Sequence, residues 1–275
     1  MTTTFEPATA VREQIIRTRD GAASTRVLIG GDGPPVVYLH GLEGLQWDQF
    51  HDELAASRTV YAIEHVGSGE STGLEEFYDL WDLVSHYEEA LDELELAETA
   101  LVGHSFGGMV AAEVAAQLRR RISRLVLLAP LGLWDDDHPV AEINAIPNGR
   151  RAEILLADTS RPLPRLLAPD PADYEALFHA ELNSASISQF SWPFAEKGLR
   201  RRLYRVTAPT LLVWGAQDQV IDPLYAGYFT AGLRVPATTE VLPGLGHLLH
   251  LEDSGTVAAR VRAHLTEGNP GGRPA

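Results

Sequence analysis

The sequence contains no cysteine, and this absence excludes disulfide bonds, thiolate zinc sites and cysteine nucleophiles. Lysine is nearly absent too, since Lys197 is the only one in the chain. The 22 Lys and Arg residues face 38 Asp and Glu, which gives a formal net charge of −16. The short basic run at 119–121 suits a helix end better than a binding patch. We therefore expect neither nucleic acid nor a membrane surface as a partner.

Long apolar runs are missing as well, since none approaches the roughly 18 residues of a membrane span. The N-terminal stretch MTTTFEPATA has neither a basic start nor an apolar core, so we expect no secretory signal. These absences predict a soluble cytoplasmic protein. The chain of 275 residues, 45% of them hydrophobic, suffices for one large core without demanding two.

Short β-rich apolar runs alternate with longer helical patterns, which is typical of a parallel sheet covered by helices. Most runs are apolar on both faces, as expected for strands buried between two helical layers. An antiparallel pair, REQIIRT and TRVLIGG joined by a DG turn, precedes them. The main strands are predicted at 36–39, 59–64, 99–104, 124–130, 210–215 and 239–243, and helices at 77–96 and 109–121. We predict an α/β fold with a mostly parallel, eight-stranded sheet and helices on both faces.

One segment interrupts this alternation. Residues 133–205 show proline-rich turns and helical pieces but no strand pattern, and they follow the sixth strand. An insertion of this length must pack as a layer of its own, so we predict a helical lid. The predicted core then comprises residues 1–132 and 206–267, and residues 268–275 form a flexible tail.

The stretch LVGHSFGG contains the pattern G-x-S-x-G as Gly103-His104-Ser105-Phe106-Gly107. A strand that turns at once into a helix forces its central residue into strained torsions, and side chains at the flanking positions would clash. The strain lifts the serine hydroxyl above the sheet edge, at the positive end of the next helix. The predicted strand before it and helix after it fit this turn, so Ser105 is a candidate nucleophile.

A serine hydroxyl needs a base to take its proton, and His247 is the favoured candidate among ten histidines. It follows a G-x-G turn after the last strand, where a loop can present it at the carboxyl edge of the sheet. His250, three residues further, is the alternative and would more easily point elsewhere. His40 and His104, beside glycines at strand ends, are expected to be structural.

The base in turn needs an acceptor for its second ring nitrogen. Asp218 lies just beyond the strand at 210–215 and is the favoured acid. Asp222 precedes a proline and suits the cap of the next helix better. The run of acids at 135–137 is expected to be a solvated entrance to the lid. The chain order is then Ser105, Asp218, His247.

Acyl transfer also requires donors for the negative charge on the carbonyl oxygen. The backbone N–H of Phe106, at the start of the helix, is one predicted donor. The second is the N–H of Leu42, in the loop His40-Gly41-Leu42-Glu43-Gly44 after the strand at 36–39.

Together, the stretches VVYLHGLEG, AIEHVGSGES, LVGHSFGG, LLVWGAQDQVIDP and GLGHLLHLE resemble the α/β-hydrolase superfamily in its lidded, single-domain form. The resemblance covers nearly the whole chain and implies Ser105 as nucleophile, Asp218 as acid and His247 as base. Two departures are visible. The family pattern D-x-P-G-x-G-x-S is here E-H-V-G-S-G-E-S at 64–71, and the proline that usually follows HLE is replaced by Asp253.

A lid over the sheet edge implies an enclosed, mostly apolar pocket for an acyl or alcohol group. Residues near the lid and the loop at 40–44 are candidates to line it: Glu43, Trp47, Trp134, Phe190, Trp192 and Phe194. No phosphate-binding glycine motif and no histidine–carboxylate metal spacing is present, so we expect neither cofactor nor metal.

The leading functional hypothesis is a serine esterase that hydrolyses a small or medium carboxylic ester, lactone or related acyl compound through an acyl-enzyme. One alternative is hydrolysis of a carbon–carbon bond in a vinylogous diketone, of the meta-cleavage type. The loop HGLEGLQW lacks the glycine- and serine-rich character associated with that class, which makes the alternative weaker. The other is a ligand-binding receptor or slow hydrolase of the same fold.

Overall fold

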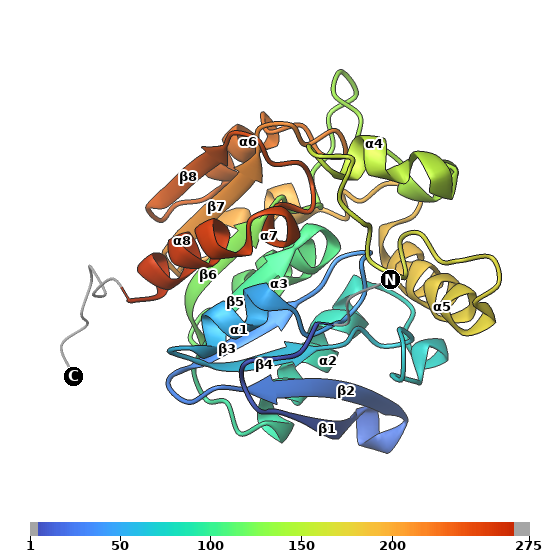
Figure 1. The fold of residues 1–275 in the computed structure, drawn as a ribbon. Coiled ribbons are helices and arrows are strands. Elements are labelled where there is room, and N and C mark those ends of the chain that lie inside the picture. The colour runs from blue at the N-terminus through green and yellow to red at the C-terminus, as the bar shows by residue number, and fades with distance from the viewer. Residues whose placement is uncertain (1–4, 267–275) are drawn as a thin grey trace.

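The computed structural model describes residues 5–266 and confirms the predicted α/β architecture, with one large sheet between helices (Figure 1). Within the described residues the sheet has eight strands, in the order β1-β2-β4-β3-β5-β6-β7-β8. The strands are β1 Val11–Thr18, β2 Ala23–Gly30, β3 Pro35–Leu39, β4 Thr59–Ile63, β5 Thr99–His104, β6 Ile122–Leu128, β7 Thr210–Gly215 and β8 Ala237–Leu242. The tail predicted at 268–275 lies outside the described residues.

Strand pairing is mostly parallel, as the doubly apolar runs predict. Strand β2 pairs antiparallel with β1 on one side and with β4 on the other, whereas all other neighbours run parallel. Every residue of β5 and of β7 is buried, because these central strands are covered on both faces. The carboxyl ends of the parallel strands therefore meet at one edge of the sheet.

The helices that cover the sheet are α1 Gln49–Ala55, α2 Leu80–Glu93, α3 Ser105–Gln117, α6 Tyr225–Gly232, α7 Leu249–Glu252 and α8 Ser254–Thr266. Helices α1 and α8 pack together on one face, and α2 and α3 pack together on the other. The start of α2 is fixed by Asp79, whose carboxylate accepts hydrogen bonds from the N–H groups of Trp81 and Asp82. Among the described residues, no helix has both the length and the apolar character needed to cross a membrane.

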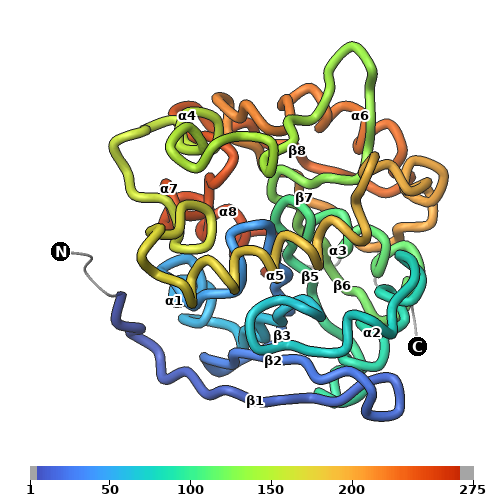
Figure 2. The backbone as a smooth tube through the Cα atoms, turned by 90° about the vertical axis from the view of Figure 1, so that its right-hand side faces the viewer, coloured from blue at the N-terminus to red at the C-terminus, as the bar shows by residue number. Residues whose placement is uncertain are grey.

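The segment 129–209 connects β6 to β7 and contains no strand. We call it the insertion. Its helices are η3 Ile143–Ala145, η4 Asn148–Arg150, α4 Arg151–Leu155, α5 Tyr174–Ser191, η5 Leu199–Arg201 and η6 Leu203–Arg205. Helices α4 and α5 lie beyond the carboxyl edge of the sheet, and α5 passes across the ends of β5 and α3 (Figure 2). The division into a core and a helical lid stays a prediction.

Candidate active site

Ser105 occupies a sharp turn between β5 and α3. Its φ is +52°, in the left-handed region that residues with a side chain seldom adopt. The flanking glycines are required for close packing: a Cβ on Gly103 would lie 2.3 Å from the carbonyl oxygen of Gly107, and one on Gly107 would lie 2.2 Å from that of Leu39. Glycine at both positions therefore lets the chain turn and present the Ser105 hydroxyl at the carboxyl edge.

The structure brings Ser105, His247 and Asp218 together. His247 Nε2 lies 3.0 Å from Ser105 Oγ, and His247 Nδ1 lies 2.9 Å from Asp218 Oδ2. All three are buried, with relative exposures of 7%, 1% and 6%. Because the Asp218 carboxylate accepts the Nδ1–H, the lone pair of His247 Nε2 faces the hydroxyl, and this arrangement can take up its proton.

Asp218 is itself held in place by its second oxygen. Oδ1 accepts hydrogen bonds from the N–H groups of Val220 at 2.8 Å and Ile221 at 3.0 Å, in the loop that follows β7. The competing acids lie elsewhere. Asp222 accepts from the N–H of Leu224 ahead of α6, and Asp135 accepts from the hydroxyl of Tyr228.

The loop after β3 lies beside Ser105. A Cβ on Gly41 would lie 2.6 Å from Glu43 Oε2, 2.9 Å from His104 Nδ1 and 3.0 Å from the Cβ of Ser105, so glycine lets the loop approach this closely. Leu42, Ser105 and Phe106 line one cavity, which places both predicted donor residues next to the hydroxyl. Phe106 is the second residue of α3, so its N–H has no acceptor within the helix.

The cavity at Ser105 measures about 180 Å³ and is mostly apolar. Trp134 and Trp192 line it, as expected from the sequence, and Glu142 is the only charged residue among those that do. Other lining residues come from the insertion and from the loop after β7, namely Leu131, Val140, Ile143, Ile187 and Val220.

Four residues predicted for this pocket lie elsewhere. Phe190 is buried against Phe106 and Phe77, behind the cavity wall. Phe194 is 54% exposed, with its ring edge against Trp134.

Trp47 packs against the helix that follows, where its Nε1–H donates to Asp52 and its ring leaves no room for a Cβ on Gly30. Glu43 does not line this cavity, and its carboxylate faces His104 and His250 instead. These four residues lie near the pocket in the sequence, but nearness in sequence does not determine the direction in which a side chain points.

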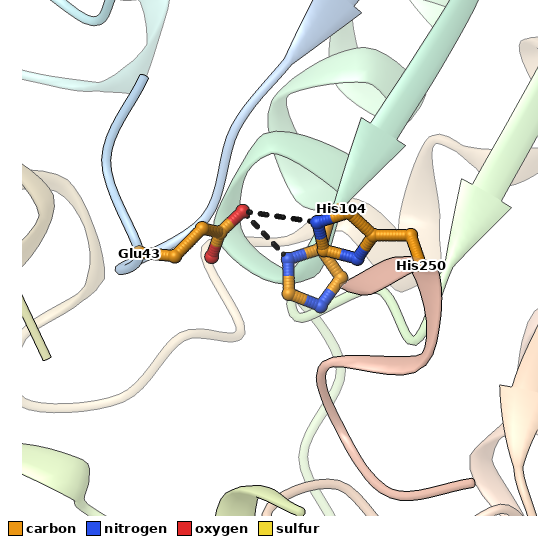
Figure 3. Close-up of side chains that lie close together, drawn as sticks. All are labelled: Glu43, His104 and His250. Carbon is orange, nitrogen blue, oxygen red and sulfur yellow. Dashed lines mark hydrogen bonds and ion pairs between the residues drawn. The ribbon is translucent and has the colours of Figure 1, made fainter. Parts of the chain in front are cut away.

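Glu43 forms a buried cluster with His104, the residue that precedes Ser105, and with His250 (Figure 3). Glu43 Oε1 accepts hydrogen bonds from His104 Nδ1 at 2.9 Å and from the N–H of Gly41 at 2.8 Å. The other nitrogen of His104, Nε2, lies 2.9 Å from the carbonyl oxygen of His247. His104 thus connects the loop after β3 to the loop that carries His247.

The cluster has the residue types of a metal site, and its ligand atoms lie within 4.8 Å of one another. Its geometry is that of an ion pair instead. Both nitrogens of His104 face acceptors, so both carry protons, and a ring protonated on both nitrogens has no lone pair for a metal. The 2.9 Å between Nδ1 and Glu43 Oε1 is a hydrogen-bond distance.

The pKa shifts agree with this interpretation. Burial alone would lower the pKa of His104, but the charge and hydrogen bond of Glu43, together with the His247 carbonyl and the charge of Asp218, outweigh burial and raise it. Burial would likewise raise the pKa of Glu43, yet the charge of His104 and its hydrogen bond hold that pKa well below the usual range. His250 is buried beside them, and burial together with the charge of His104 lowers its pKa to about 3. The cluster therefore holds one carboxylate, one imidazolium and one neutral imidazole.

Comparisons with a family model, with related sequences and with solved structures agree on one protein family. Residues 36–260 match the family model described as "Alpha/beta hydrolase family". The chain is 31% identical over 255 residues to the dihydrolipoyllysine-residue acetyltransferase component of an acetoin cleaving system from Pseudomonas putida, a match that covers 86% of this chain and 65% of that protein. The present chain thus spans slightly less than two thirds of the length of that relative.

Two further matches cover most of both chains. The 2-hydroxy-6-oxo-2,4-heptadienoate hydrolase of Pseudomonas putida is 28% identical, and the match covers 85% of this chain and 90% of that one. The crystal structure of naproxen esterase from Bacillus subtilis superposes with a TM-score of 0.74 at 18% identity, covering 94% and 93% of the two chains. The last likeness shows a shared fold.

Proposed function

The chain belongs to the alpha/beta hydrolase family, and on this premise we propose that it is a serine hydrolase of a neutral carboxylic ester, lactone or related acyl compound. One observation carries the proposal: the hydrogen-bond chain from Ser105 Oγ through His247 to Asp218, with distances of 3.0 and 2.9 Å. In this proposal the insertion is the lid over the cavity.

Ser105 Oγ attacks the acyl carbon while His247 Nε2 takes the hydroxyl proton. The negative charge that develops on the carbonyl oxygen is met by the N–H groups of Leu42 and Phe106. Asp218 holds the His247 ring and stabilises the imidazolium. The imidazolium then gives its proton to the leaving alcohol, and an acyl-enzyme forms. Water, deprotonated by His247, releases the acid and restores Ser105.

The cavity supports a neutral and fairly small substrate. Its volume of about 180 Å³ lies below the range of roughly 300–1,000 Å³ typical of drug-sized ligands. Glu142, its only charged lining residue, is an acid, so a carboxylate would meet repulsion and no partner there. An uncharged acyl group of small or medium length fits both features.

Carbon–carbon hydrolysis is the second candidate, because a relative 28% identical is a 2-hydroxy-6-oxo-2,4-heptadienoate hydrolase. Such a dienoate is a carboxylate, and neither arginine nor lysine is among the residues that line the cavity here. The ester hypothesis is therefore preferred.

The test is turnover of p-nitrophenyl esters from acetate to octanoate by the wild type and by Ser105→Ala. We expect kcat to fall at least about 10⁴-fold in the variant, as it does when a triad serine is removed. We expect the wild type to be fastest on esters of short to medium chain length. Labelling by a fluorophosphonate provides the control, since it reports a nucleophilic serine whatever the substrate is. A wild type that is labelled yet cleaves only a dienoate would favour the second candidate. If it is neither labelled nor active but binds small ligands, the protein is a receptor of this fold.

A further inference from the structure

Asn183, in the middle of α5, is a polar side chain that the proposed mechanism does not use. It is 1% exposed and projects from the insertion onto the core. Its Nδ2 donates to the carbonyl oxygen of Leu42 at 2.6 Å, and its Oδ1 accepts from the hydroxyl of Ser68 at 2.9 Å. Because the Leu42 carbonyl can only accept, the amide orientation is fixed by its partners. Asn183 thus joins the insertion to two core loops.

The Leu42 carbonyl is the point at which this amide contacts the loop of the proposed oxyanion hole. A residue's backbone has two soft torsions, set by the peptide planes before and after it. The plane before Leu42 is held from the core, since its oxygen, that of Gly41, accepts from His40 Nδ1 at 2.7 Å and from the N–H of Gly44 at 3.3 Å. The plane after Leu42 carries the carbonyl that Asn183 holds. Leu42 is therefore fixed on one side by the core and on the other by the insertion.

We propose that Asn183 is a positioning residue: the Leu42 N–H lies in the plane that the core holds, and Asn183, by holding the following plane, keeps Leu42 from shifting, so that the insertion completes the oxyanion hole when it packs on the core. The proposal rests on the proposed function, because that function makes the Leu42 N–H an oxyanion donor. Asn183 itself does not line the cavity at Ser105. Its effect is thus on the transition state, where charge develops on the substrate oxygen, rather than on substrate binding.

The chain offers a matched control on the same helix. Ser186, one turn further along α5, is also fully buried, and its hydroxyl donates to the carbonyl oxygen of Val66 at 2.6 Å. This bond ties the insertion to the loop after β4 and does not touch the loop of Leu42. Ser186→Ala therefore removes a comparable contact between insertion and core while the bond to Leu42 stays.

The experiment measures kcat and KM for the preferred ester in Asn183→Ala, Asn183→Asp and Ser186→Ala. Removing a whole oxyanion donor costs about 10²–10³-fold in kcat, so misplacing one is expected to cost about 10- to 100-fold. We expect this loss in both Asn183 variants, with KM changed less than about threefold and Ser186→Ala within about threefold of the wild type. Affinity for a trifluoromethyl ketone, whose hemiketal oxyanion needs the same donors, should fall in parallel with kcat.

Asn183→Asp keeps the side-chain volume and the acceptor for Ser68 but replaces the donor to Leu42, so it stands in if the alanine variant does not fold. Hydrogen exchange of the peptide covering residues 40–48 reads loop order without any substrate. Faster exchange in the Asn183 variants, but not in Ser186→Ala, supports the proposal even if no ester is cleaved. Unchanged kcat and unchanged exchange in a folded Asn183 variant, or equal losses in Ser186→Ala, would overturn it.

Discussion

Replacing Glu43 with glutamine tests its buried ion pair with His104. The substitution keeps the shape of the side chain and an oxygen to accept the N–H of Gly41, but it removes the charge that faces His104. In the wild type that charge raises the pKa of His104, whereas burial alone would lower it. Without the carboxylate, the imidazolium loses its hydrogen-bonded counterion, and burial then favours the neutral ring.

The expected loss follows from the burial of the pair. The side chains of His104 and Glu43 are 0% and 7% exposed, and their hydrogen bond measures 2.9 Å. Removing one partner of such a buried pair destabilises a protein by about 3–5 kcal/mol. With a slope of about 3 kcal/mol per M urea, the unfolding midpoint of Glu43→Gln falls by about 1–1.7 M near pH 6.

The pH dependence of this loss is the more specific result. A raised pKa for His104 adds stability that is complete below its usual value of 6.5 and disappears as the pH rises through the raised value. A lowered pKa for Glu43 adds stability that is complete above 4.5 and is lost as the pH falls. The loss in Glu43→Gln is therefore largest between these values and shrinks toward pH ~9.

Urea unfolding followed by tryptophan fluorescence at both pH values measures this difference, and most other titrating groups contribute equally to wild type and variant. A double variant, Glu43→Gln with His104→Gln, should recover part of the loss because it removes both charges together. A loss below about 1 kcal/mol at pH 6, or one that is equal at pH 6 and 9, would refute the ion pair.

Three further predictions concern stability. His86 is buried in its neutral form, and burial lowers its pKa from 6.5 to about 4. The free energy of unfolding should therefore fall by on the order of 3 kcal/mol as the pH drops from 7 to 4, and by less in His86→Gln. Equal shifts of the urea midpoint in the wild type and the variant would contradict this. The Glu113 carboxylate is 3% exposed and accepts hydrogen bonds from the Arg202 guanidinium at 2.6 and 2.7 Å. Arg202→Ala removes this counterion and should lower the free energy of unfolding by about 3 kcal/mol. A loss under about 1 kcal/mol would count against the prediction. Gly107→Ala should not fold, since its Cβ would lie 2.2 Å from a carbonyl oxygen, whereas Gly149→Ala has free space and should match the wild type in soluble yield and Tm.

The sheet could be predicted because its strands are continuous apolar runs with glycine-rich ends. TALVGH and TLLVWG, buried at every residue, coincide with β5 and β7. The helix after Ser105 was expected from residue 109 but begins at Ser105 itself. Gly107 and Gly108 are poor helix formers, so the local pattern does not predict a helix there. Both positions are glycine because their close packing leaves no room for a Cβ.

The cavity walls and the contacts of the insertion could not be predicted. Asn183 and Leu42 are 141 residues apart, and nothing in the local pattern of either stretch indicates their contact. Trp192 and Phe190 are two positions apart, yet one lines the cavity and the other packs behind it. The one available signal for Glu43 is its position in a glycine-rich loop directly after a buried strand, where an acid needs a buried partner.

The insertion leaves the sheet after β6 and returns to β7, two strands that pair with each other in parallel. The sheet thus fixes the two ends of this segment. Doubling the length of a flexible loop raises the free-energy cost of holding its ends together by only about 0.6 kcal/mol. We therefore expect that replacing the insertion would change the shape of the cavity at Ser105 while the turn at Ser105 stays intact. Under the proposal made above, a replacement segment would still have to donate a hydrogen bond to the Leu42 carbonyl, as Asn183 does here.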